Sequence, residues 1–219
     1  DVCSSDLGAI GLGSEIDRCD ARCYSKDKSY AFLCPYALAA KGGFFMKRSI
    51  NDLELEVAIG DIAGQKDMTA VVNAANAQLM MGGGVAGALH RAAGAGLEKE
   101  CRPLAPIKPG EAVITGGHNL PNRYVIHCLG PVYGQDEPSD QLLTACYRNA
   151  LNLAEKHEID AIAFPAISTG AFGYPAADAA QIALQTITEQ APKLEYVKKI
   201  RIVLFNQADY DVYRHLLGE

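Results

Sequence analysis

The sequence contains no tryptophan, no long apolar run and no excess of positive charge. No stretch reaches the roughly 18 consecutive apolar residues that a membrane-spanning helix needs, so we expect no contact with a membrane. Acidic residues outnumber Lys and Arg by 26 to 20, which gives a net charge of −6. Non-specific nucleic-acid binding depends on Lys and Arg that neutralise phosphates, so this balance argues against a nucleic-acid partner. A small phosphate ligand is not excluded, because backbone N–H groups bind phosphate without cationic side chains.

The seven cysteines form no C-x-x-C pair and match no common zinc motif. Cys101, Cys128 and Cys146 are scattered through the longer part of the chain, and we interpret them as buried thiols in a reduced cytoplasm. The four histidines after residue 100 also lack the spacing of metal ligands. The sequence therefore predicts no metal site, no cofactor and a cytoplasmic location.

Residues 1–45 differ from the rest of the chain. They hold four of the seven cysteines and show no sustained helical or strand periodicity. A basic cluster followed by an apolar stretch and Ala-x-Ala loosely resembles a secretory signal, but Pro35 interrupts the apolar part. Met46 looks like a natural initiator. We therefore expect residues 1–45 to be a leader of foreign origin and residues 46–219 to form the domain.

Strand and helix patterns alternate through residues 46–219. Leu53, Leu55, Val57 and Ile59 alternate with less apolar residues, the pattern of a half-buried strand. Further strands are expected over residues 69–73, 111–115, 123–128, 160–165 and 199–205. Helices are expected over residues 85–101, 139–154, 175–190 and 209–217, with Ser139 as the N-cap of the second. This order predicts an α/β domain with helices on both faces of a mixed sheet.

Three loops follow directly from apolar strands, at residues 60–62, 73–87 and 167–174. In open α/β sheets, ligands bind at the carboxyl edge of the strands. The second and third loops are rich in glycine, and each runs into a helix N-terminus, which attracts anions. Two such loops that face each other would suit a diphosphate. The alternative is that the glycines only make tight turns.

Five segments together resemble the macrodomain family in order and spacing. They are Gly60–Ile62, Val71–Asn76, Gly82–His90, Val125–Tyr133 and Pro165–Gly173. The resemblance covers about residues 50 to 218. It implies a three-layer α/β/α domain with a central mixed, mostly parallel sheet, and a cleft that binds ADP-ribose or an ADP-ribosylated protein. We expect the protein to act as a monomer.

The resemblance also implies roles for particular residues. Asp61 would accept a hydrogen bond from the adenine amino group, with the Ile62 backbone beside it and Phe205 against the ring. A turn cap is the alternative for Asp61, and core packing is the alternative for Phe205. Asn76 would bind the distal ribose, and Asn73 would brace the loop. The diphosphate would lie between two sets of residues, Gly83, Gly84, Val85 and Ala86 on one side and Ser168, Thr169, Gly170, Ala171 and Phe172 on the other.

One position departs from the hydrolases of the family. MacroD-type hydrolases carry Asp where this chain has Ala86, four residues before a histidine that matches His90. Residues four apart share a helix face, so the Asp and His of those enzymes can act together. Similar macrodomains with Ala at this position still hydrolyse ADP-ribosyl esters. We therefore expect Asn76 and His90 to be the catalytic residues, with a structural role as the alternative for His90.

Three functions are consistent with this interpretation. The first is hydrolysis of ADP-ribosyl esters, either on acidic residues of mono-ADP-ribosylated proteins or in O-acetyl-ADP-ribose. The second is a reader that binds ADP-ribose without turnover, which Ala86 favours. Phosphatase activity on ADP-ribose-1''-phosphate is a third possibility, although the sequence shows no phosphatase nucleophile.

Overall fold

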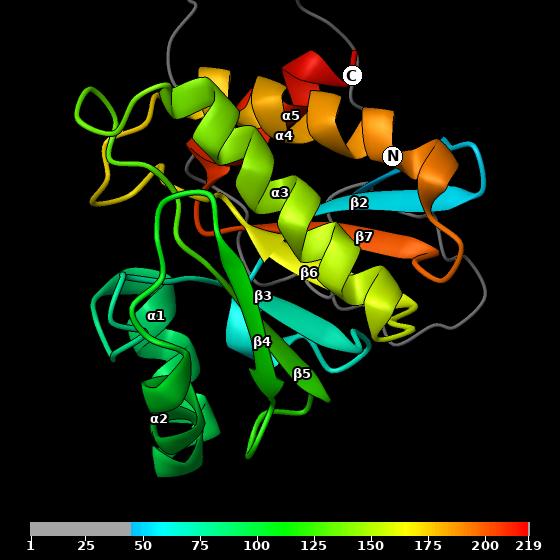
Figure 1. The fold of residues 1–219 in the computed structure, drawn as a ribbon. Helices are drawn as coiled ribbons and strands as arrows, with labels where there is room; N and C mark the ends of the chain where they lie inside the picture. The colour runs from blue at the N-terminus through cyan, green and yellow to red at the C-terminus, as the bar shows by residue number, and fades with distance from the viewer. Residues whose placement is uncertain (1–44, 219) are drawn as a thin grey trace, which may run out of the picture. The chain divides into compact units, whose positions relative to one another are not determined.

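The computed structural model describes residues 45–218, which form one seven-stranded sheet with helices on both of its faces (Figure 1). The expected leader, except for Phe45, lies outside the described residues. The strands are β1 (Phe45–Ile50), β2 (Leu53–Ile59), β3 (Ala70–Ala74), β4 (Ala112–Gly116), β5 (Tyr124–Cys128), β6 (Ala161–Pro165) and β7 (Lys199–Leu204). The helices are α1 (Gly84–Ala93), α2 (Ala95–Cys101), α3 (Ser139–Lys156), α4 (Ala176–Gln190) and α5 (Gln207–Leu216), with single turns at Ile62–Gly64, Arg102–Leu104 and Ala191–Lys193.

The sheet has the strand order β1-β2-β7-β6-β3-β5-β4. The five inner strands are mutually parallel, and β1 and β4 pair antiparallel at the two edges. The predicted mixed, mostly parallel sheet is therefore confirmed. Because the inner strands run in one direction, the loops that follow β2, β7, β6, β3 and β5 all leave from the same edge.

Two apolar clusters pack on opposite faces of the sheet. Helices α3, α4 and α5 cover one face, and α1 and α2 cover the other (Figure 1). The central strand β6 shows the division clearly, because Ile162 and Phe164 enter the first cluster while Ala161 and Ala163 enter the second. Burying a large apolar side chain contributes about 1.5–3 kcal/mol, so both layers stabilise the sheet. No helix within residues 45–218 is long and apolar enough to cross a membrane.

Three details differ from the expected elements. Strand β1 was not expected, and it begins one residue before the expected domain boundary; its residues face mostly solvent, so they lack an alternating pattern. The segment expected to be helical over 85–101 breaks at Gly94, where φ is 78°. The predicted N-cap role of Ser139 is wrong: Ser139 is the first helical residue, and its N–H donates to Glu137 Oε2 at 3.0 Å.

A buried polar cluster lies between the sheet and helices α1 and α2. Asn73 on β3 and Thr115 on β4 flank His127 on β5. His127 Nδ1 lies 3.1 Å from Asn73 Nδ2, and His127 Nε2 lies 2.9 Å from Thr115 Oγ1. Cys101 Sγ at the end of α2 lies 3.6 Å from the same His127 Nε2. Burial, together with the nearby His90 ring, lowers the pKa of His127 to about 3, so this ring is neutral at physiological pH.

We expect the free energy of unfolding to fall as pH falls below about 6.5, because His127 protonates there only in the unfolded state. The pKa of His127 is lower in the folded protein, so its contribution is fully present above the unfolded pKa and declines down to about pH 3. One such histidine changes stability by at most about 1.4 kcal/mol per pH unit. In urea titrations between pH 7 and 5, His127→Gln should be less stable at pH 7 but decline less steeply. His215→Gln, exposed on α5, is the control, and parallel curves for wild type and His127→Gln would contradict this origin.

Candidate functional site

The two glycine-rich loops meet at one cavity on the carboxyl edge of the sheet. The cavity has a volume of about 270 Å³. Its lining comes from the loops after β3, β5 and β6 and from the start of α1. The lining residues are Ala74, Ala75, Asn76, Gly82, Gly83, Gly84, Val85, Ala86, Gly130, Ala166, Ile167, Ser168, Gly170, Ala171 and Phe172. None of these residues carries a charge, so any ligand they bind is held by neutral groups.

The N-terminus of α1 forms one wall of this cavity. Gly83 is its N-cap and provides no side-chain cap, and the first turn contains no acidic residue. The first N–H groups of a helix have no acceptor within the helix, and the helix dipole places partial positive charge there. Gly84 has a φ of 53°, a conformation that favours glycine. This wall therefore presents backbone donors suited to an anion.

Gly87 allows the glycine-rich loop to pack closely against α1. A Cβ atom at Gly87 would lie 2.4 Å from the carbonyl oxygen of Gly82, closer than real contacts permit. Gly87 lies outside the cavity lining, but it holds the loop that carries the donors. Sequence reasoning did not single out this role, because it depends on a contact between two particular backbone atoms.

Ser168 on the opposite wall combines a strained backbone with an unpaired hydroxyl. Its φ is 67°, which costs a non-glycine residue about 1–3 kcal/mol. Ser168 is 6% exposed, and its Oγ has no hydrogen-bond partner among the described residues. A buried hydroxyl without a partner is also destabilising, by about 1–3 kcal/mol. Both costs are explained if a ligand in the cavity accepts a hydrogen bond from Ser168.

Gly130, in the loop after β5, lies directly behind Ser168. A Cβ atom at Gly130 would meet Ser168 Oγ at 2.1 Å and Ile167 Cγ2 at 2.7 Å. The absence of a side chain at Gly130 therefore allows the Ser168 loop to pack directly against the loop after β5. Gly130 was missed as a site residue, since a glycine inside an apolar motif gives no chemical signal.

Asn76 lines the cavity and also shapes the loop that follows β3. Its Nδ2 donates to the carbonyl of Met80 at 2.8 Å, and its Oδ1 accepts from the Met80 N–H at 3.1 Å. A primary amide has two N–H donors and two acceptor lone pairs, so one of each remains for a ligand. Asn76 can therefore bind a ligand hydroxyl while it holds the loop.

Asp61 and Phe205 leave the sheet from adjacent positions. Gly60 precedes Asp61, and Leu204 precedes Phe205; the N–H of Gly60 donates to the carbonyl of Leu204 at 2.9 Å. Asp61 caps the single turn Ile62–Gly64, with its Oδ1 accepting from the Ala63 N–H at 2.9 Å. Phe205 is 92% exposed, which rules out core packing in this structure. Neither lines the cavity; both lie at the same sheet edge and are open to a ligand.

Several predicted site residues do not line the cavity. Asn73 is fully buried with its amide on His127, so it braces the β3 end rather than contacting a ligand. Thr169 Oγ1 donates to the carbonyl of Ala166 at 3.1 Å. Ile62, the first residue of the turn that Asp61 caps, is buried in the apolar cluster that also contains residues of α1. Each of these side chains has a structural role in the described part of the chain.

His90 is also absent from the cavity lining, although it shares α1 with Ala86. It is 2% exposed, and its Nε2 has no hydrogen-bond partner within residues 45–218. Burial lowers the pKa of His90, so the ring is neutral at physiological pH. Ala86 reaches the cavity, whereas His90 packs between the helix and the sheet. The structure therefore places His90 in the buried part of α1, outside the cavity lining.

The three cysteines within residues 45–218 add no reactive group to the site. Cys101, Cys128 and Cys146 are buried free thiols, as predicted. Burial raises the pKa of Cys101 to about 11 and that of Cys146 to about 12, so both are protonated at neutral pH. Among the described residues, no group of His, Cys, Asp and Glu is arranged to hold a metal ion.

Comparisons with known proteins agree with this geometry. The sequence profile of the macro domain matches residues 72–183. A macro domain-containing protein of Methanosarcina mazei is 44% identical over 163 residues, covering 74% of this chain and 87% of that protein. An O-acetyl-ADP-ribose deacetylase of Cronobacter sakazakii is 44% identical over 172 residues, covering 75% of this chain and 94% of the enzyme.

A solved structure shows the same arrangement of elements. The macrodomain of Oceanobacillus iheyensis, determined with ADP, superimposes with a TM-score of 0.76 and 42% sequence identity. The match covers 80% of this chain and 95% of that one. The profile, the sequence relatives and the solved structure agree, and this chain belongs to the macro domain family.

Proposed function

We propose that this protein binds ADP-ribose in the cavity and hydrolyses ADP-ribosyl esters. The observation that carries the proposal is the buried Ser168 hydroxyl, which has no partner within residues 45–218 and lies across the cavity from the N-terminus of α1, where no side chain caps the helix. Two sets of neutral donors that converge on one space suit a diphosphate, which has acceptor oxygens on every side. The similarity to a macrodomain determined with ADP supports the same ligand chemistry.

The remaining residues suggest how ADP-ribose is oriented, with the adenine at one end of the site and the second ribose at the other. Asp61 and the exposed ring of Phe205 lie beyond the cavity and are suited to adenine. Asn76 and Phe172 line the cavity itself, where the second ribose would lie. The free donor and acceptor of Asn76 match the paired donor and acceptor character of ribose hydroxyls. The linkage to be cleaved would therefore lie near Asn76.

The chemistry we propose is ester hydrolysis by positioning rather than by a dedicated acid–base pair. A water molecule adds to the ester carbonyl, the bond from that carbon to the ribose oxygen breaks, and the ribose oxygen takes up a proton. Ala86 provides no carboxylate, and His90 is buried away from the cavity. Asn76, the diphosphate oxygens and the N–H groups of α1 would orient the water and stabilise charge. The lack of general acid–base help would cost ~10²–10⁴-fold in rate.

A reader function is the second candidate, and Ala86 favours it. Without a carboxylate at the cavity, the same donors bind ADP-ribose just as well but give no base to activate water. The partner in that case would be an ADP-ribosylated protein held without turnover. The two functions share the binding site and differ only in the fate of the ester.

Turnover separates the two functions. We expect the full chain to release ADP-ribose from a glutamate-linked mono-ADP-ribosylated protein, and Asn76→Ala to slow release by about 10²-fold, as loss of a positioning group does. Asn76 also holds its loop through the Met80 backbone, so the affinity of Asn76→Ala for free ADP-ribose should be measured in parallel. A large loss of affinity would show that the loop has moved. Asn152→Ala, exposed on α3, is the control. Binding without release by the wild-type chain would identify a reader instead.

Gly130→Ala tests whether the Ser168 wall binds the ligand. The added methyl group would collide with Ser168 Oγ and push the loop into the cavity. We expect the affinity for ADP-ribose to fall about tenfold or more, as the loss of a buried hydrogen bond and its geometry implies. Gly116→Ala on β4 is the control, since its Cβ would make an ordinary 3.5 Å contact with Glu100. Unchanged calorimetric affinity in Gly130→Ala would show that the diphosphate lies elsewhere.

A further inference from the structure

We propose that Gln65 is a positioning residue for adenine recognition, and that it acts by tying the Asp61 turn to an ionic network centred on Arg201. The inference rests on the proposed binding of ADP-ribose. Gln65 and Arg201 would then set the base selectivity of the site without touching the ligand.

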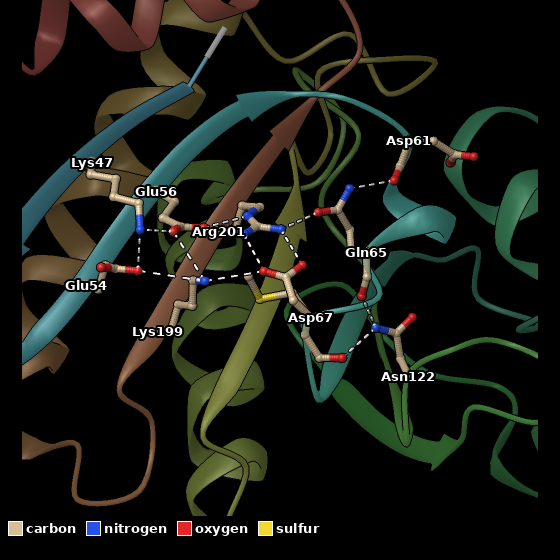
Figure 2. A network of polar contacts seen from close by, with 10 residues as sticks. Lys47, Glu54, Glu56, Asp61, Gln65, Asp67, Asn122, Lys199 and Arg201 are labelled. Carbon is tan, nitrogen blue, oxygen red and sulfur yellow. Dashed lines mark hydrogen bonds and ion pairs between the residues drawn. The ribbon is translucent and has the colours of Figure 1, made fainter. Parts of the chain in front are cut away.

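The side chain of Gln65 bridges the Asp61 turn and Arg201 (Figure 2). Gln65 Nε2 donates to the carbonyl of Asp61 at 2.7 Å, and Gln65 Oε1 accepts from Arg201 Nη1 at 2.8 Å. The backbone carbonyl of Gln65 accepts from Asn122 Nδ2 at 2.7 Å. Both ends of the Gln65 amide are therefore engaged, and the turn is held from the sheet and from the loop before β5.

Arg201 is a rigid anchor for this bridge. Its Nε donates to Glu56 Oε2 at 2.6 Å, and its Nη1 and Nη2 donate to the two oxygens of Asp67 at 2.8 and 2.7 Å. Such two-point pairing fixes the plane of a guanidinium. Glu56 and Arg201 are also direct neighbours in the register of β2 and β7. The guanidinium therefore has little freedom to move away from Gln65.

The network around Arg201 balances its charges. Lys47 and Lys199 pair with Glu56 at 2.8 and 3.3 Å, and Glu54 bridges the same two lysines. Burial raises the pKa of Glu56, but hydrogen bonds from Lys47 and Arg201 outweigh it and hold the pKa below its usual range. Hydrogen bonds from Arg201 also hold the pKa of Asp67 well below its usual range. Glu56 and Asp67 are therefore ionised at neutral pH, and their ion pairs with Arg201 persist there.

The bridge controls how the Asp61 carboxylate is presented. The carbonyl of Asp61 accepts both from Gln65 Nε2 and from the Gly64 N–H, while the carboxylate projects away from Gln65 (Figure 2). Holding the carbonyl fixes the backbone of the turn and the Cα–Cβ direction of Asp61, and it keeps the Ala63 N–H in place to hold the carboxylate. Arg201 also lies on β7, the strand that leads into Phe205. Arg201 is therefore bonded through Gln65 to the turn that carries Asp61 and lies on the strand that precedes Phe205.

The carboxylate direction matters because it distinguishes adenine from hypoxanthine. Adenine carries an exocyclic amino donor where hypoxanthine carries a carbonyl acceptor. A carboxylate accepts from the first and repels the second, and this discrimination depends on hydrogen-bond distance and angle. A loosened turn would therefore lose selectivity more than it would lose overall affinity.

The test compares the affinities of ADP-ribose and inosine diphosphate ribose for the full chain by calorimetry. Wild type should prefer ADP-ribose, and Asp61→Asn should abolish that preference. Gln65→Met, which keeps length but loses both hydrogen bonds, should weaken ADP-ribose binding by about tenfold and the inosine analogue by less than about twofold. Gln65→Glu keeps the contact with Arg201 but loses the donor to Asp61, so it should behave like Gln65→Met. Unchanged melting temperatures would show that the variants are folded.

Glu54→Gln is the matched control. Glu54 belongs to the same network and pairs with Lys47 and Lys199, but it contacts neither Arg201 nor Gln65 in the described structure. Its replacement should leave the affinity ratio unchanged. Equal loss of both ligands in Gln65→Met, or the same change in Glu54→Gln, would overturn the positioning role alone. Failure of the wild-type chain to bind ADP-ribose would instead overturn the proposed function, and this inference with it.

Discussion

The first turn of α1 presents backbone N–H groups that have no acceptor within the helix, and the rest of the site is built around them. The loop before this turn lies flat against the helix because Gly87 has no side chain, and Gly84 adopts a conformation that favours glycine. Ser168 faces the same space from the loop after β6, with a strained backbone and a hydroxyl that has no partner in the described part of the chain. Unpaired donors that converge from two walls are costly in an empty protein and favourable once an anion binds.

The parallel sheet is what brings these donors together. Strands β2, β7, β6, β3 and β5 run in one direction, so the loops that carry Asp61, Phe205, Ser168, Asn76 and Gly130 leave from one edge. The site has two parts, a cavity lined by uncharged residues and a group of ion pairs that holds the Asp61 turn. The cavity offers neutral donors, whereas the ion pairs lie behind the Asp61 turn on β1, β2 and β7. Binding by neutral donors explains how an acidic chain can hold a diphosphate without cationic side chains in the cavity.

Much of the fold was visible in the sequence because its signals are local. The alternation over β2, the apolar run of β6 and the glycine-rich loops each depend on a few adjacent residues. The resemblance to macrodomains added the order of the loops and the expected ligand. Strand β1 was missed because an edge strand with both faces largely exposed carries no alternating pattern. The break at Gly94 was missed because the apolar pattern continues on both sides of it.

The features that escaped prediction depend on contacts between distant parts of the chain. Ala86 and His90 share one face of α1, yet only Ala86 lines the cavity, because Ala86 lies in the first turn of the helix and His90 lies about one turn further along. The bond between Asn73 and His127 depends on strand pairing between β3 and β5. Gln65 and Arg201 are 136 positions apart, and no local pattern links them. Composition and spacing do not show which side of a helix or loop faces a ligand.

The most direct test of the central claim is a crystal structure of the full chain with ADP-ribose. We expect the diphosphate to lie between the first turn of α1 and the Ser168 loop, with Ser168 Oγ now donating a hydrogen bond to a phosphate oxygen. The adenine should lie beside Asp61 and Phe205, and the second ribose beside Asn76. A ligand bound outside this cavity, or a Ser168 hydroxyl that remains unpaired with the ligand in place, would contradict the assignment.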